Sequence, residues 1–177
     1  MNHFFSFSRV RRDASRRRVA NGFTLMELLI VMAIISVLML IGFPSYKAIM
    51  KKTHEMSAKK SLQSIQQAEQ MYATSYPSKG FACDLKFLGG DAKSGPPSAT
   101  AAQLLPEDLT LGYKDGYNFA IVNCTKNNQG GSERVDDFML TATPSTVGKT
   151  GDKGFCYDNG EMKQDPAGGV NCTEIAR

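Results

Sequence analysis

The chain has 177 residues, with 21 basic and 17 acidic side chains, a formal net charge of +4 and only two histidines. Six of the basic residues are arginines within positions 1–22, where Asp13 is the single acid. The remainder therefore carries 15 basic and 16 acidic side chains, a net charge of −1. The basic balance belongs to the first 22 residues and does not indicate a nucleic-acid-binding body, so nucleic acid is not an expected partner.

Residues 23–43 form an apolar run in which Glu27 is the only ionisable residue. As a helix the run would span roughly 31 Å, about the thickness of the hydrocarbon core of a membrane. An acid in such a helix usually marks a partner or a pathway, because a charge in lipid is costly. The alternative is a plain signal anchor that tolerates a polar residue near one interface. The arginines before the run favour a cytoplasmic N-terminus and a body on the other side.

A dense pattern of characteristic residues covers this run. It comprises Gly22, Phe23, Thr24, Leu25, Glu27, Leu28, Leu29, Ile30, Val31, Ala33, Ile34, Ile35 and Pro44. The pattern resembles the N-terminus of the type IV pilin family, which includes the pseudopilins of type II secretion. The leader is longer than is usual for members whose mature chain begins with phenylalanine.

The resemblance implies a role for four of these residues. A prepilin peptidase would cut between Gly22 and Phe23 and methylate the new amine on Phe23. Glu27 would act in assembly, and Pro44 would bend the helix. An ordinary secretory signal places its cleavage site after the apolar run. Here the cut falls before it, so the apolar helix would stay in the mature protein.

Four segments follow from this interpretation. The leader, residues 1–22, is removed. Residues 23–44 form the membrane-spanning and assembly half of a long helix, and residues 45–76 form its amphipathic second half. Residues 77–177 form a globular head.

The stretch from 45 to 76 is rich in residues that favour helix, and Pro77 can end it. Apolar residues recur along it at near-helical spacing, which predicts the face packed on the head. They are Ile49, Met56, Leu62, Ile65, Ala68 and Tyr72.

Beyond the helix the pattern predicts a loop over 78–99, a short helix over 101–105 and then consecutive strands. We expect the strands at 117–123, 134–143, 154–157 and 161–164, with Asn159-Gly160 as a hairpin turn. Consecutive strands after a long helix favour an antiparallel sheet on one face of it, an α+β fold. The resemblance implies the same type IV pilin-like fold.

Four cysteines lie in the predicted head: Cys83, Cys124, Cys156 and Cys172. An even number in an exported body favours disulfides over four unpaired thiols, and three pairings exist. We favour Cys156–Cys172, which would close a short C-terminal loop worth about 3 kcal/mol in the chain-entropy model. The second pair, Cys83–Cys124, would tie the loop after the helix to the end of the first strand. A C-terminal disulfide loop is also common in the family.

The residue types in the sequence offer little support for a catalytic site. His3 lies in the leader and His54 on the helix, where we expect it to face solvent, so a histidine-based triad or zinc site lacks parts. The tripeptide at 148–150 is similar to the end of a phosphate-binding loop. That motif requires a glycine where Thr143 stands, so we interpret the tripeptide as a surface turn. We expect no enzyme activity and no cofactor.

Acidic residues gather in the C-terminal third: Asp136, Asp137, Asp152, Asp158, Glu161 and Asp165. Calcium uses such oxygen ligands, and some major pseudopilins bind calcium in this region. No EF-hand spacing is present, so we expect solvated turn residues and no metal.

Three functions remain open. The first is a structural subunit of a type IV pilus, and the second a pseudopilin of a type II secretion system. The third is a membrane-anchored binding module, such as a minor pilin for DNA uptake. It would need a basic face from lysines that are interleaved with acids, namely Lys114, Lys126, Lys149, Lys153 and Lys163.

The expected partners are other copies of the chain through the N-terminal helices, a prepilin peptidase, an inner-membrane assembly platform and the lipid bilayer. The precursor would sit in the inner membrane as a single-pass protein with its head outside the cytoplasm. It would then enter an extracellular pilus or a periplasmic pseudopilus.

Overall fold

The structure is a computed structural model that describes residues 22–128, 133–158 and 160–176, apart from the side chains of 41–45. The chain divides into two compact units, Met1–Ile41 and Gly42–Arg177. Residues 1–21 of the predicted leader lie outside the described residues.

Helix α1 comprises Leu25–Ser75, close to the predicted range of 23–76. It begins after Thr24, whose hydroxyl oxygen accepts a hydrogen bond from the Glu27 N–H at 3.2 Å. A threonine that accepts from the third helical N–H is an N-cap, because it satisfies a donor that has no partner inside the helix. Thr24 and Glu27 also have the spacing of a capping box. The cap explains why Phe23 stays outside the helix.

In the second unit, α1 buries one stripe of apolar side chains. The prediction is confirmed for Leu62, Ile65, Ala68 and Tyr72, which are at most 3% exposed. It is wrong for Ile49 and Met56, which are each 61% exposed. These two precede buried Ala58 by nine and two residues, about half a turn out of phase with a period of 3.6. They therefore lie on the opposite face of the helix.

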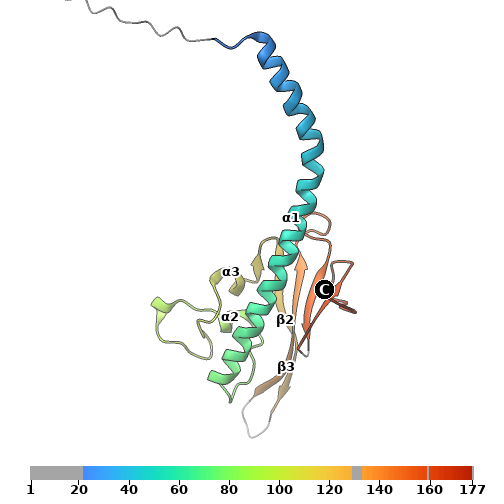
Figure 1. The fold of residues 1–177 in the computed structure, drawn as a ribbon. Coiled ribbons are helices and arrows are strands. Elements are labelled where there is room, and N and C mark those ends of the chain that lie inside the picture. The colour runs from blue at the N-terminus through green and yellow to red at the C-terminus, as the bar shows by residue number, and fades with distance from the viewer. Residues whose placement is uncertain (1–21, 129–132, 159, 177) are drawn as a thin grey trace, which may run out of the picture. The chain divides into compact units, whose positions relative to one another are not determined.

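A six-stranded antiparallel sheet packs on this stripe, with its strands in chain order (Figure 1). The strands are β1 Tyr113–Lys114, β2 Tyr117–Asn127, β3 Arg134–Pro144, β4 Gly154–Asp158, β5 Glu161–Asp165 and β6 Glu174–Ile175. The α+β layout and the four predicted strands are confirmed. The two edge strands were not predicted, because each has only two residues and shows no alternating pattern.

The segment between α1 and the sheet holds three short helices. They are α2 Leu85–Leu88, the 3₁₀ helix η1 Ala92–Ser94 and α3 Glu107–Thr110. Asp84 and Asp91 cap the first two by accepting backbone N–H groups of Lys86 and Lys93 at 3.0 and 2.9 Å. The predicted loop over 78–99 contains α2 and η1, which the sequence pattern does not reveal because helices of three or four residues have no detectable periodicity.

The predicted helix at 101–105 is wrong. The N–H groups of Ala102 and Leu105 donate to the carbonyls of Phe87 and Leu88 at 2.8 and 3.0 Å, which holds the segment extended against α2. Leu105 also precedes Pro106, and the residue before a proline avoids the helical region. The helix α3 begins only after that proline.

One acid is buried in the core. Glu69 on α1 is 0% exposed, and its Oε2 accepts the Ala82 N–H at 2.8 Å. Its Oε1 has no hydrogen-bond partner among the described residues. Burial raises the pKa of Glu69 to about 8. The side chain is therefore protonated and neutral at pH 7, which removes the cost of burying an unpaired carboxylate.

This burial predicts a pH-dependent stability. An unfolded chain ionises Glu69 near 4.5 and the folded chain near 8, so the folded state holds the extra proton between these values. The free energy of unfolding should therefore fall as pH rises through this window, by up to about 1.4 kcal/mol per pH unit. Urea unfolding of the detergent-solubilised chain, followed by tyrosine fluorescence, measures this slope.

The control variant is Glu69→Gln, which keeps the shape and the acceptor for Ala82 but cannot ionise. Its stability should vary less with pH across the same window. Parallel pH profiles for the wild type and the variant would contradict the buried-acid interpretation.

Candidate functional site

The described part of the first unit, residues 22–40, is exposed throughout. Its large apolar side chains run from 45% exposed at Ile35 to 82% at Leu40. Soluble monomers rarely expose a continuous apolar surface of this size. Residues 23–40 therefore form a continuous exposed apolar surface, and we call it the apolar segment.

Gly22 and Phe23 stand before the first turn of α1, in a backbone without regular structure. Both are exposed, and a Cβ added to Gly22 would meet no atom within 4 Å. The fold of the chain therefore imposes no steric need for glycine at this position. Any requirement for Gly22 must come from a molecule that approaches this peptide.

Glu27 lies in the first turn of α1, four residues after Phe23 in the sequence. An acid in the first turn is favoured there, because the unpaired N–H groups give a helix N-terminus a partial positive charge. The only other polar side chain within residues 25–40 is Ser36, whose hydroxyl donates to the Met32 carbonyl at 2.8 Å. The Ser36 hydroxyl has its hydrogen-bond partner within its own helix, whereas the Glu27 carboxylate accepts no hydrogen bond from a side chain of another described residue.

No helix is both long and apolar enough to cross a membrane within the part of the chain that the structure describes. The predicted span of 23–43 includes residues 41–43, whose side chains lie outside that part. Pro44 falls there as well, so the bend at this residue stays a prediction.

The structure pairs the cysteines as Cys83–Cys124 and Cys156–Cys172, the two pairs favoured from the sequence. The first joins the segment before α2 to β2. Strand β2 continues past its predicted end at 123, with a bulge between Val122 and Thr125 that contains Cys124. A bulge redirects a strand locally, which brings this cysteine toward Cys83.

The second disulfide closes a loop that Asp165 organises from inside. The Asp165 side chain is 5% exposed, and its oxygens accept the N–H groups of Ala167 and Asn171, each at 2.9 Å. The prediction that the acids of this region are solvated is therefore wrong for Asp165. An aspartate that accepts the N–H two residues later forms an Asx turn, and the sequence Asp-Pro-Ala-Gly-Gly carries that signal.

The residues considered for metal binding, phosphate binding or catalysis do not form a common site among the described residues. Asp152 pairs with Lys51 at 2.8 Å, and the described residues contain no cluster of acids, histidines or cysteines that could hold a metal. The tripeptide at 148–150 lies in a turn, as expected. His54 is half-buried and not fully solvent-facing, because it lies one turn before Ala58 on the buried stripe.

The chain is thus an α+β protein whose N-terminal helix begins with an exposed apolar segment. Comparison with known families makes this specific: residues 17–43 match the prokaryotic N-terminal methylation motif. The chain therefore carries the signal of type IV pilins and pseudopilins, and the resemblance found in the sequence is confirmed. The match does not extend into the head. No curated protein and no solved structure matches the chain.

The two disulfides should contribute differently to stability. Cys83 and Cys124 are 41 residues apart, against 16 for Cys156 and Cys172. In the chain-entropy model the longer loop contributes about 4 kcal/mol and the shorter about 3 kcal/mol. We expect the serine double variant of the first pair to lose more free energy of unfolding, as measured by urea titration of the detergent-solubilised chain.

Peptide mapping without reduction checks the pairing itself. It should recover both linked peptides and no free thiol. A Cys83–Cys156 or Cys83–Cys172 peptide would contradict the connectivity.

Proposed function

We propose that the chain is a structural subunit that polymerises through its N-terminal helix into a type IV pilus-like filament. One observation carries the proposal: the methylation motif at 17–43 overlaps the first part of α1, in which every described apolar side chain of residues 23–40 is exposed. The motif implies cleavage by a prepilin peptidase and assembly into a pilus-like filament, and proteins with it are structural. A bundle of many such helices would supply the apolar surroundings that the segment requires.

The proposed route has two stages. The arginine-rich leader would hold the N-terminus in the cytoplasm while residues 23–43 anchor the precursor in the inner membrane, with the head on the far side. After cleavage between Gly22 and Phe23, an assembly platform would move the subunit from the bilayer into the filament. In both stages the apolar segment would be covered, first by lipid and then by neighbouring helices.

Glu27 would link cleavage to assembly. Cleavage creates an amine on Phe23, and an unperturbed α-amine has a pKa of about 7.7–8.0, so it can carry positive charge near neutral pH. In a staggered bundle of helices, Glu27 of one copy can neutralise the amine of its neighbour. The pair relieves two charges that would otherwise be stranded in apolar surroundings.

Among filament proteins, a pilus subunit is the function supported best. The head ends in a loop closed by Cys156–Cys172, and a C-terminal disulfide loop is common in pilins. A secretion pseudopilin would use the same helix and the same signal. Their locations distinguish the two, because a pilus is recovered by shearing cells and a pseudopilus is periplasmic.

Three of the five lysines that a nucleic-acid-binding role would need form ion pairs with acids. Lys114 pairs with Asp108 at 2.9 Å, Lys126 with Glu133 at 2.7 Å and Lys163 with Asp158 at 3.7 Å. Each ion pair cancels a charge that a phosphate backbone would require.

Processing gives the first test. The mature subunit should begin at a methylated Phe23, as read by mass spectrometry of filaments sheared from cells. Gly22→Val should block cleavage, because a side chain prevents close approach of the peptidase while the fold itself tolerates it. Thr24→Ser, which keeps the capping hydroxyl, is the control and should be cleaved. A filament subunit that begins at Met1, or normal cleavage of Gly22→Val, would overturn the proposal.

Assembly gives the second test. Glu27→Ala and Glu27→Gln should yield a cleaved and membrane-inserted subunit that is nearly absent from sheared filaments. Insertion should not suffer, because removing the charge makes the helix more apolar. Ser36→Ala removes a polar group that is already satisfied within the helix, so this control should assemble normally.

The measurement compares subunit in the membrane with subunit in the sheared fraction. A wild-type yield of filaments from both Glu27 variants, with no other pilin present, would contradict the role of this carboxylate. Loss from the membrane itself would contradict the expectation that insertion is independent of Glu27.

A further inference from the structure

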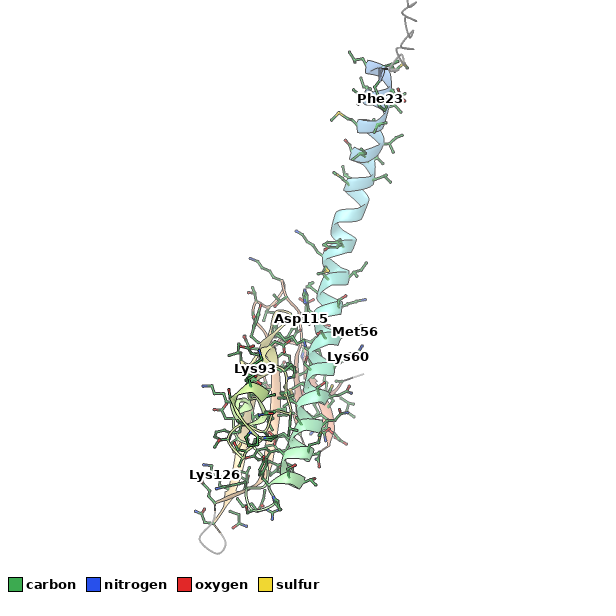
Figure 2. All side chains as sticks on the ribbon, turned by 90° about the vertical axis from the view of Figure 1, so that its left-hand side faces the viewer. Phe23, Met56, Lys60, Lys93, Asp115 and Lys126 are labelled. Atoms are coloured by element: carbon green, nitrogen blue, oxygen red, sulfur yellow. A yellow bond between two sulfur atoms is a disulfide. The ribbon has the colours of Figure 1, made fainter. Side chains whose placement is uncertain are left out.

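The face of α1 opposite the buried stripe carries a distinctive row in the second unit. Lys52, Met56 and Lys60 follow one another at intervals of four residues, so they lie on one line along the helix. All three are exposed, Met56 by 61%, and neither lysine forms an ion pair with another described residue. We call these three residues the basic row. Figure 2 shows Met56 and Lys60 on the side of the second unit opposite Lys93.

No acid on this part of α1 compensates the basic row. The two acids in the second half of α1 are Glu55 and Glu69. Glu55 is half-buried and accepts the Asp152 N–H at 3.0 Å, and Glu69 lies in the core. The row therefore presents an apolar side chain between two cations.

A second surface has the complementary character. A groove of about 450 Å³ is lined by Gly90, Asp91, Leu105, Glu107, Thr110 and Leu111. Leu111 is 73% exposed there, and neither carboxylate forms an ion pair with another described residue. One Asp91 oxygen accepts the Lys93 N–H as the cap of η1. We call this surface the acidic groove.

The two surfaces are complementary in charge, and the groove has room for a side chain. The groove can accept a methionine, an unbranched side chain that adapts to irregular apolar sites. The lysines on either side of Met56 lie about 6 Å along the helix from it, given a rise of 1.5 Å per residue. Their flexible ammonium groups can then reach the carboxylates that flank the groove.

We infer that the basic row of one copy docks into the acidic groove of the next copy. The two surfaces are different patches, and the groove lies beside η1, whose Lys93 is on the opposite side of the unit from Met56 (Figure 2). Each added copy therefore offers a free row and a free groove, which is the head-to-tail arrangement from which a filament can be built. The inference rests on the proposed filament function and adds to it a contact between heads.

Cross-linking tests the contact directly. The double variant Met56→Cys/Leu111→Cys, oxidised with copper phenanthroline in sheared filaments, should give a ladder of dimers, trimers and longer multimers on a non-reducing gel. Each single variant has one added thiol and can give dimers at most. Filaments of the double variant that yield no species above the dimer would overturn the inference. Absence of filaments from the wild type would instead overturn the proposed function.

Charge reversal tests it without added cysteines. Lys52→Glu/Lys60→Glu and Glu107→Lys should each lower filament yield about tenfold, because like charges would then face each other. The two changes combined in one chain should recover part of the yield, because the introduced glutamates then face the introduced lysine although Asp91 stays acidic. Lys149→Glu and Glu161→Lys alter exposed charges elsewhere on the head and serve as matched controls with normal yield.

Membrane levels of every variant confirm that the subunit is folded and inserted. Wild-type yield from both reversals, or the same loss in the controls, would overturn the inference. Failure of the combined variant to recover, with both single reversals defective, would also count against a direct contact between these residues.

Discussion

The change of apolar pattern along helix α1 is the constraint on which the other features of the protein depend. Residues 58–72 bury one stripe, which the sheet can cover, and leave a polar face in water. The described residues 23–40 are apolar on every side apart from Glu27 and the satisfied hydroxyls, so no single face of a head could cover them. The two parts of the helix therefore differ in pattern, and the described part of the chain covers only the stripe of residues 58–72.

The head is held together by more than its apolar core. The segment between α1 and β1 has little regular structure, and it is fixed to α1 by the contact of Glu69 with Ala82 and to β2 by Cys83–Cys124. The C-terminal segment is fixed by Cys156–Cys172 and by the turn around Asp165. A small domain with short edge strands gains stability from such links, because a core of this size leaves little margin.

Charges have a separate task from apolar burial in the proposed filament. Apolar attraction is not directional, so it allows helices to pack in many relative positions. Charged groups favour the positions in which each charge meets an opposite one, since bringing like charges together costs free energy. Glu27 would act in this way between N-termini, and the basic row and acidic groove would act between heads. The two contacts lie on different units of the chain, so both the helix and the head would define how copies stack.

The sequence by itself determined the N-terminal signal, the long helix and the order of the four longer strands. These features depend on local pattern: a dense motif around Gly22 and Glu27, helical spacing, and alternation bounded by turn residues. The exposure of Met56 and Ile49 follows from their helical phase relative to the stripe, but only the tertiary structure decided which face of the helix the sheet covers. It also decided that residues 101–105 are extended and that Glu69 and Asp165 are buried, because each outcome depends on partners far along the chain or across a turn. Local propensity contains no information about such partners, and packing against them overrides it.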